Sequence, residues 1–297
     1  MEKLLSHVLF YGILMPISLL PMRLLYLLSD VICFIIKHIV KYRRNVILSN
    51  LRNSFPEKDE KEIRRIADKY YVHLSDLVVE SIKMLTISRK NLLKRYKCTN
   101  PSILYPYFST GRSVLLVSAH YNNWEYMVAS LELQLKHHGI GVGKRMSNKT
   151  FEELVFKRRT RYGTEVCYAD NSRKVLEDYD KSGKACAYML LSDQSPNNTK
   201  KCYWTDFLHQ KTAVIYGPEY IAKKYDYPVF FYKVSKTKRG YYSFEIVKLT
   251  DEPRQTPYGW ICEQALMQLK SMLDAHPQYW LWSHRRWKHK YEESMGL

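Results

Sequence analysis

The sequence predicts an α/β fold with a mostly parallel central sheet flanked by helices. It also predicts an N-terminal hydrophobic helical segment that anchors this fold to a membrane. Three observations support this prediction: the first 40 residues are largely apolar, a basic cluster follows them directly, and short apolar runs then alternate with longer helix-like stretches. We therefore divide the chain into a membrane anchor, residues 1–43, and one body, residues 44–297.

The apolar segment covers residues 4–40 and is interrupted by Pro16 and Pro21. Arg23 and Asp30 divide it further, so neither apolar run reaches the roughly 20 residues that a spanning helix needs. A kinked span, a re-entrant hairpin and an interfacial hairpin all fit this pattern. The alternative is a buried helical hairpin in a soluble protein. The segment is too long for a signal peptide and lacks a small-residue cleavage site.

The charge of the chain indicates an anionic partner. Lys and Arg number 47 against 29 Asp and Glu, which gives a net charge of +18. Because Lys37, Lys41, Arg43 and Arg44 follow the apolar segment at once, the pattern favours an anionic membrane surface over nucleic acid. The positive-inside rule then places the body on the cytoplasmic side. The six scattered cysteines have no metal-binding spacing, so we expect free thiols and no metal.

The elements of the body follow from hydrophobic spacing. Apolar residues recur every three or four positions over 57–86, which predicts an amphipathic core helix. Buried strands are predicted over 113–118, 187–191, 229–234 and 242–247. Helices are predicted over 124–135, 149–162, 173–181, 212–224 and 257–275. This alternation is typical of a parallel sheet.

The candidate chemistry lies after the strand 113–118. His120 follows its end, and Glu125 lies in the first turn of the next helix, for which Asn122 or Asn123 is a plausible N-cap. A tight turn could bring the Glu125 carboxylate to one ring nitrogen of His120, which would make the other nitrogen a general base for a hydroxyl. A single His after a strand is often structural, so this spacing alone does not identify an active site. There is no G-x-S-x-G elbow, Walker loop or dinucleotide fingerprint, so we expect no covalent enzyme intermediate.

The order of the motifs resembles the lipid A biosynthesis acyltransferase family, the late acyltransferases within the lysophospholipid acyltransferase superfamily. The stretches that carry the resemblance are 44–56, 120–125 as the family's HxxxxD/E motif, 145–148, 159–163, 192–194 and 279–287. Two departures stand out. Glu125 replaces the Asp of many members, and Phe207-Leu208-His209 replaces a Phe-Gly step in a loop beside the expected site.

The resemblance implies a glycerolipid acyltransferase-like fold and an enzyme that esterifies a hydroxyl of a lipid A precursor. The acyl donor would be a thioester of acyl carrier protein or coenzyme A, with no other cofactor. An acidic carrier protein suits a chain of net charge +18. The location implied is the cytoplasmic face of a bacterial inner membrane.

The resemblance also suggests roles for residues. His120 would act as the base, and Glu125 would orient it. Substrate-binding roles are suggested for Arg145, Asn148, Arg159, Arg161, Asp193, Gln194, His284, Arg285 and Arg286. Arg145, Arg159 and Arg161 would clamp phosphate on the glycolipid or the donor arm. His284, Arg285 and Arg286 would bind lipid phosphate. The competing interpretations are a solvated helix face, a turn cap at Asp193 and a terminal strand over 284–286.

Three alternative functions remain open at this point. The first keeps the chemistry but changes the acceptor to a lysophospholipid, another glycolipid or an aminolipid. The second is a membrane-tethered nucleic-acid binder, although no RNA-binding signature is present. The third is a catalytically inactive scaffold of the same fold.

Overall fold

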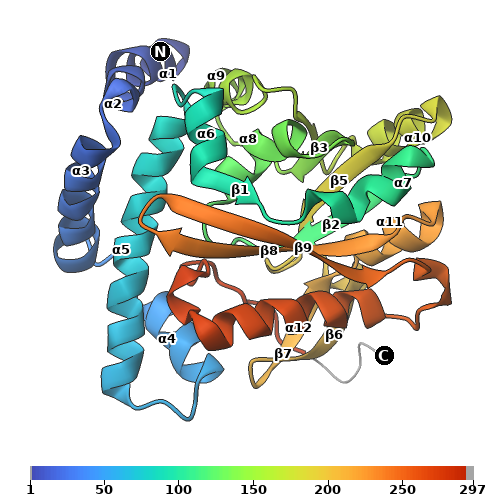
Figure 1. The fold of residues 1–297 in the computed structure, drawn as a ribbon. Coiled ribbons are helices and arrows are strands. Elements are labelled where there is room, and N and C mark those ends of the chain that lie inside the picture. Colours follow the sequence, from blue (N-terminus) through green and yellow to red (C-terminus); the bar gives the residue numbers. More distant parts are fainter. Residues whose placement is uncertain (1, 292–297) are drawn as a thin grey trace.

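The fold is an α/β structure built on one central sheet. The computed structural model describes residues 2–291, apart from the side chain of Lys200, so the end of the predicted body, 292–297, lies outside the described residues. A seven-stranded sheet crosses the molecule with helices on both faces, and a two-stranded sheet lies beside it (Figure 1). The predicted α/β class with a mostly parallel sheet flanked by helices is confirmed.

The central sheet has the strand order β1-β9-β8-β2-β5-β3-β4. Its strands are β1 (Tyr96–Cys98), β2 (Val114–Ser118), β3 (His138–Gly143), β4 (Glu165–Tyr168), β5 (Cys186–Leu191), β8 (Val229–Lys238) and β9 (Tyr241–Thr250). All neighbouring pairs are parallel except β8 and β9. β2 and β5 are therefore adjacent, parallel and central.

Strand β2 shows why the sequence forms this sheet. All five of its residues are buried. Leu115 and Val117 join one hydrophobic cluster, and Val114 and Leu116 join another. A continuous apolar run is expected where both faces of a parallel strand are covered. β2 thus carries the core on both sides and fixes the direction of the residues that follow it.

The helices of the body close the two faces of the sheet. They are α4 (Arg44–Ser54), α5 (Glu60–Met84), α6 (Arg89–Arg95), α7 (Tyr105–Ser109), α8 (Trp124–Gln134), α9 (Lys149–Arg159), α10 (Ser172–Ser182), α11 (Gly217–Tyr225) and α12 (Trp260–Ala275). Helix α5, the predicted core helix, begins after Asp59, whose carboxylate accepts from the Glu62 amide. Of the two N-caps considered for α8, Asn123 fills the role, because its side chain accepts from the Tyr126 amide.

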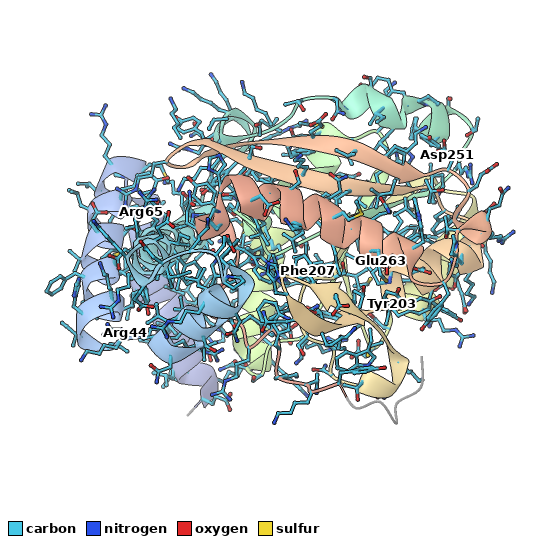
Figure 2. All side chains as sticks on the ribbon, turned by 90° about the horizontal axis from the view of Figure 1, so that it is seen from below. Arg44, Arg65, Tyr203, Phe207, Asp251 and Glu263 are labelled. Atoms are coloured by element: carbon cyan, nitrogen blue, oxygen red, sulfur yellow. The ribbon has the colours of Figure 1, made fainter. Side chains whose placement is uncertain are left out.

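The predicted helix over 212–224 is wrong in its first part. Strand β7 (Gln210–Ile215) pairs with β6 (Cys202–Phe207) as an antiparallel hairpin, and the helix starts only at Gly217. Tertiary pairing here overrides the local helical pattern, and Pro218 suits a first helical turn. The hairpin rests on α12, where the Tyr203 hydroxyl donates to Glu263 over 2.6 Å (Figure 2).

The N-terminal segment is a bent helical pair that runs beside α5 (Figure 1). It consists of α1 (Glu2–His7), the π-helical η1 (Val8–Leu14), α2 (Met15–Leu19), α3 (Met22–Phe34) and the π-helical η2 (Ile35–Ile39). Among the described residues, no helix taken singly has the length and apolar character of a membrane span. The stretches Glu2–Leu19 and Met22–Ile39, between which the chain bends by 119°, do have that length and composition together. Membrane anchoring therefore stays a prediction, as does the division of the chain at residue 43.

Candidate active site

His120 and Asp193 meet at the carboxyl ends of the two central strands. The register of β2 and β5 pairs Ser118 with Leu191, and each of the two residues lies two positions further on. His120 Nδ1 is 2.7 Å from Asp193 Oδ1. The side chain of Asp193 is 4% exposed and that of His120 is 19% exposed. The pair is therefore a buried carboxylate that holds a partly accessible imidazole.

The environment of Asp193 determines which nitrogen of His120 is free. Its second oxygen accepts from the indole N–H of Trp280 over 2.7 Å. Burial raises the pKa of Asp193, but the charge and hydrogen bond of His120, with the Trp280 bond, bring that pKa below its ordinary value. An ionised carboxylate only accepts hydrogen bonds, so Nδ1 of His120 donates to it, and Nε2 is the nitrogen that carries the lone pair in the neutral ring. This arrangement can remove a proton from a hydroxyl group.

The predicted hydrogen bond between Glu125 and His120 does not form. Its carboxylate accepts two hydrogen bonds of 2.9 Å from Arg159 Nε and Nη2. The reason is geometric: Glu125 lies in the first turn of α8, which packs against α9, and the planar guanidinium fits a carboxylate in bidentate fashion. Asp193 takes the orienting position instead. The sequence suggests for Asp193 only a substrate-binding role or a turn cap, and no contact with His120.

The C-terminal segment forms part of the site. Tyr121 and Trp280 make an isolated antiparallel bridge, and the Asn122 amide donates to the Tyr279 carbonyl over 2.9 Å. Asn122 itself has a φ of 58°, a conformation that Asn tolerates better than most residues. The terminal strand considered over 284–286 does not form, because that stretch has turn rather than strand structure. Sequence reasoning included Trp280 in a motif but gave it no role.

The three arginines of the predicted phosphate clamp do not gather at one place. Arg145 pairs with Asp170 at the surface and lies 4.0 Å from the centre of the Tyr168 ring. Arg161 donates to the carbonyls of Met84 and Ile87, at and just beyond the end of α5, and to that of Arg158. These bonds satisfy carbonyls that a helix end leaves free, so Arg161 is already used as a cap.

Asn148 is also engaged within the chain. Its Oδ1 accepts from the Phe151 amide and so caps α9, while its Nδ2 donates to Ser6 Oγ over 2.9 Å. Among Arg145, Asn148, Arg159 and Arg161, only Arg159 therefore hydrogen-bonds with a residue of the His120–Glu125 motif. Gln194 is half-buried beside Asp193.

His284, Arg285 and Arg286 have three different environments. His284 Nε2 accepts from the Ser195 amide, and burial lowers the pKa of His284 to about 4, which keeps the ring neutral. Arg286 is 2% exposed and donates to the Ala213 carbonyl of β7. Burial lowers the pKa of Arg286 to about 10. A side chain so enclosed does not lie at the surface where the lipid contact was expected, and a phosphate contact of Arg286 stays a prediction. Arg285 is exposed.

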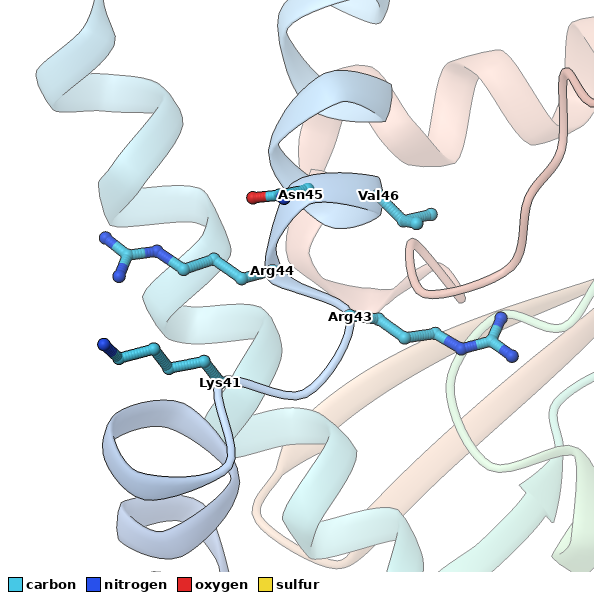
Figure 3. Close-up of a pocket in the computed structure, with 5 residues that line it drawn as sticks. All are labelled: Lys41, Arg43, Arg44, Asn45 and Val46. Atoms are coloured by element: carbon cyan, nitrogen blue, oxygen red, sulfur yellow. The ribbon is translucent and has the colours of Figure 1, made fainter.

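A basic cavity lies where the N-terminal helical pair joins the body. It has a volume of about 470 Å³ and is lined by Lys41, Arg43, Arg44, Asn45 and Val46. Figure 3 shows Lys41 and Arg44 pointing to one side and Arg43 to the other. Arg43 donates to the Ser283 carbonyl over 2.9 Å. The cavity does not include His120 or Asp193 in its lining, so it is separate from the candidate active site.

The fold and the site together define a class of protein. Ligand sites at the carboxyl ends of central strands are typical of open α/β enzymes, and here a histidine and a carboxylate meet at that place. Residues 3–289 match the bacterial lipid A biosynthesis acyltransferase family, and the chain belongs to that family. The resemblance seen in the motifs is confirmed. No curated protein matches the chain.

Family membership makes the chain an acyltransferase of lipid A biosynthesis.

Proposed function

We propose that this enzyme transfers a fatty acyl group from an acyl thioester to a hydroxyl of a lipid A precursor, with His120 as the general base. The observation that carries the proposal is the His120–Asp193 pair at the ends of β2 and β5. Nε2 removes the hydroxyl proton as the oxygen attacks the thioester carbonyl carbon. The C–O bond forms, the C–S bond breaks, and the thiolate takes the proton from the imidazolium. Asp193 stabilises the charge on that imidazolium.

Glu125 in the first turn of α8 and Arg159 at the end of α9 support this chemistry as a pair. Their side chains are 18% and 27% exposed, so the pair lies at the edge of the site rather than in the core. The guanidinium uses two of its five N–H groups on Glu125 and keeps others for a phosphate of the acceptor or of the donor arm. In this proposal Glu125 fixes Arg159 and does not act on His120.

We assign the donor to an acyl carrier protein, because such carriers are acidic and this chain has a net charge of +18. The acceptor is a lipid, and the exposed apolar residues of the N-terminal helical pair, among them Leu27, Phe34 and Ile39, suit an interfacial position. Lys41 and Arg44 would then face anionic headgroups. The proposed location is the cytoplasmic face of the bacterial inner membrane.

An in vitro transfer assay tests the proposal. Purified protein is given radiolabelled acyl thioesters of acyl carrier protein and of coenzyme A, with a lipid A precursor and a panel of lysolipids. We expect label on the lipid A precursor, and a loss of roughly 10²- to 10⁴-fold in turnover for His120→Ala. His138→Gln is the matched control, because His138 begins β3 and so lies at the amino ends of the parallel strands, opposite His120. This variant should keep its activity. Turnover of His120→Ala within threefold of the parent would exclude His120 as the base.

A further inference from the structure

One buried carboxylate joins three distant parts of the chain behind the active site. Glu80 of α5 is fully buried, and its two oxygens accept three hydrogen bonds. Oε2 accepts from Asn123 Nδ2 over 2.6 Å and from the Tyr242 hydroxyl over 2.8 Å. Oε1 accepts from the Tyr26 hydroxyl over 2.9 Å. The three donors belong to the His120–Glu125 turn, to β9 and to α3.

The bond to Asn123 fixes the geometry of that turn. Asn123 lies between His120 and Glu125, and its Oδ1 caps α8 at the Tyr126 amide over 2.8 Å. Because the oxygen is used by the helix and the nitrogen by Glu80, the side-chain amide has one orientation that satisfies both partners. The carboxylate of Glu80 therefore acts on the path of the chain between the two motif residues.

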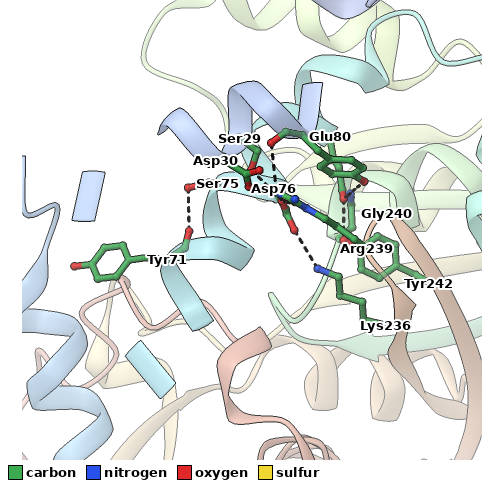
Figure 4. A network of polar contacts seen from close by, with 12 residues as sticks. Ser29, Asp30, Tyr71, Ser75, Asp76, Glu80, Lys236, Arg239, Gly240 and Tyr242 are labelled. Atoms are coloured by element: carbon green, nitrogen blue, oxygen red, sulfur yellow. Dashed lines mark hydrogen bonds and ion pairs between the residues drawn. The ribbon is translucent and has the colours of Figure 1, made fainter. Parts of the chain in front are cut away.

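The bond to Tyr26 connects the N-terminal helical pair to the same carboxylate. Next to it, Asp76 accepts from Ser29 Oγ and from Arg239 Nε, and pairs with Lys236 at 3.3 Å; Figure 4 shows this network. Gly240 has a φ of +74°, and a Cβ placed there would lie 1.8 Å from the Tyr26 hydroxyl. Only glycine allows the β8–β9 turn to approach Tyr26 so closely, so the position of Tyr26 is tightly set.

We propose that Glu80 is a positioning residue for acyl transfer, which holds the turn carrying His120 and Glu125 through Asn123. Tyr26 makes the N-terminal helical pair part of the same support. The inference rests on the proposed role of His120. A buried carboxylate is costly unless its oxygens accept hydrogen bonds, and all three bonds are made here. A displacement of about 1 Å in a catalytic group can reduce turnover on the order of 10²-fold.

The test exchanges donor and acceptor between the two side chains. Asn123→Asp keeps an oxygen for the α8 cap but places a second carboxylate against Glu80. The double variant Asn123→Asp with Glu80→Gln reverses the hydrogen bond, because the Gln amide donates to the new carboxylate. Tyr242→Phe is the matched control, since it removes a bond to the same Glu80 oxygen from outside the turn and the N-terminal pair.

The readouts separate position from stability. The kcat and KM for acyl transfer are measured well below the Tm, where every variant is folded by circular dichroism. We expect kcat to fall at least about tenfold in Asn123→Asp with KM nearly unchanged, and to return to within about threefold in the double variant. Tyr242→Phe should lower the Tm but leave kcat within about twofold. Should Asn123→Asp not fold, Asn123→Ser replaces it, because Ser also caps a helix but cannot reach Glu80.

A folded Asn123→Asp protein with the parent kcat would overturn the proposal. So would a double variant that regains the parent Tm but not its kcat. An independent readout is the NMR signal of the His120 ring in histidine-labelled protein, identified by its loss in His120→Gln. We expect that signal to shift in Asn123→Asp and to return in the double variant; an unmoved signal also overturns the proposal. If the signal behaves so while His120→Ala remains active, the positioning of the turn stands and the proposed role of His120 fails.

Discussion

Asp193 is the residue on which the candidate site depends, because it contacts both His120 and Trp280. Its carboxylate is almost fully buried, so each hydrogen bond to it is made in a low-dielectric environment and is correspondingly important. Losing either donor leaves part of a buried charge unsatisfied. The orientation of His120 therefore rests on an indole that lies some 90 residues beyond Asp193 in the chain.

A first prediction concerns that indole. Trp280→Phe removes the donor to Asp193 but keeps an aromatic ring, so we expect a loss of roughly 1.5–3 kcal/mol in the free energy of unfolding together with a lower kcat. Trp204→Phe is the matched control, because within residues 2–291 the buried Trp204 indole N–H has no hydrogen-bond partner. Denaturant titration and the transfer assay check both variants. Equal losses in the two proteins would contradict the assigned role of Trp280.

A second prediction concerns pH and His284. The folded pKa of His284, about 4, lies below the ordinary value of about 6.5, so the unfolded chain binds the proton first as the pH falls. The contribution of neutral His284 to stability is thus complete above about pH 6.5 and is lost as the pH falls toward about 4. His284→Gln can still accept from the Ser195 amide without titrating. The stability difference between parent and variant, measured by unfolding at several pH values, should change across this window and stay constant above it.

At the scale of elements, close approach between neighbouring segments decides how they pack. The β8–β9 turn closes over α3 at Gly240, whereas Gly183, which ends α10 with a φ of +68°, has no atom within 4 Å of where its Cβ would lie. Both glycines have the left-handed conformation, but only one has a crowded environment. A substitution at Gly183 therefore measures the cost of backbone strain alone, and one at Gly240 measures the cost of strain together with that of crowding.

A third prediction uses this pair of glycines. Gly183→Ala should cost about 1–2 kcal/mol of stability, the usual penalty for a left-handed Ala. Gly240→Ala should cost clearly more and should disturb the contact of α3 with the sheet, because Tyr26 has to move. Thermal unfolding measures the two costs, and limited proteolysis of residues 20–40 reports the contact. Similar costs for both variants would show that Tyr26 adjusts without penalty.

At the scale of the whole molecule, apolar and basic surfaces adjoin at the N-terminal helical pair. Leu27 and Phe34 are at least 60% exposed, and Lys41 and Arg44 line the basic cavity at the end of the pair. Exposed apolar surface of this kind indicates a binding face, and cationic side chains next to it favour an anionic one. The arrangement supports the proposed interfacial position.

A fourth prediction tests this face. Leu27→Glu with Phe34→Glu should strongly reduce co-sedimentation with anionic vesicles, because two charges would enter an apolar environment. Met267→Glu, which alters an equally exposed apolar residue on α12, is the control and should leave binding unchanged. Lys41→Ala with Arg44→Ala should weaken binding mainly at low salt, since each cation contributes about 1 kcal/mol near an anionic surface. If neither double variant reduced binding to anionic vesicles, this face would be excluded as the membrane-binding surface.

Much of the fold could be predicted from local pattern, and the site only in part. The apolar run of β2 and the Asn123 cap are local signals, and both are confirmed. The partner of Glu125 was not predictable, because Arg159 reaches it from α9, and the sequence does not give helix packing. Asp193 could be placed at a strand end, but its pairing with His120 depends on the adjacency of β2 and β5, a matter of strand order. The second strand of the β6–β7 hairpin occupies the first part of the helix expected over 212–224, because pairing rather than propensity decides there.

The bridge between Tyr121 and Trp280 also has a consequence for biosynthesis. The imidazole is made early in translation, but the indole that secures its carboxylate partner follows about 160 residues later. A nascent polypeptide can contain every strand of the central sheet and still lack the indole that donates to Asp193. With His120 as the proposed base, acyl transfer therefore has to wait until the chain has been synthesised past Trp280, and a protein shortened before this residue should be inactive.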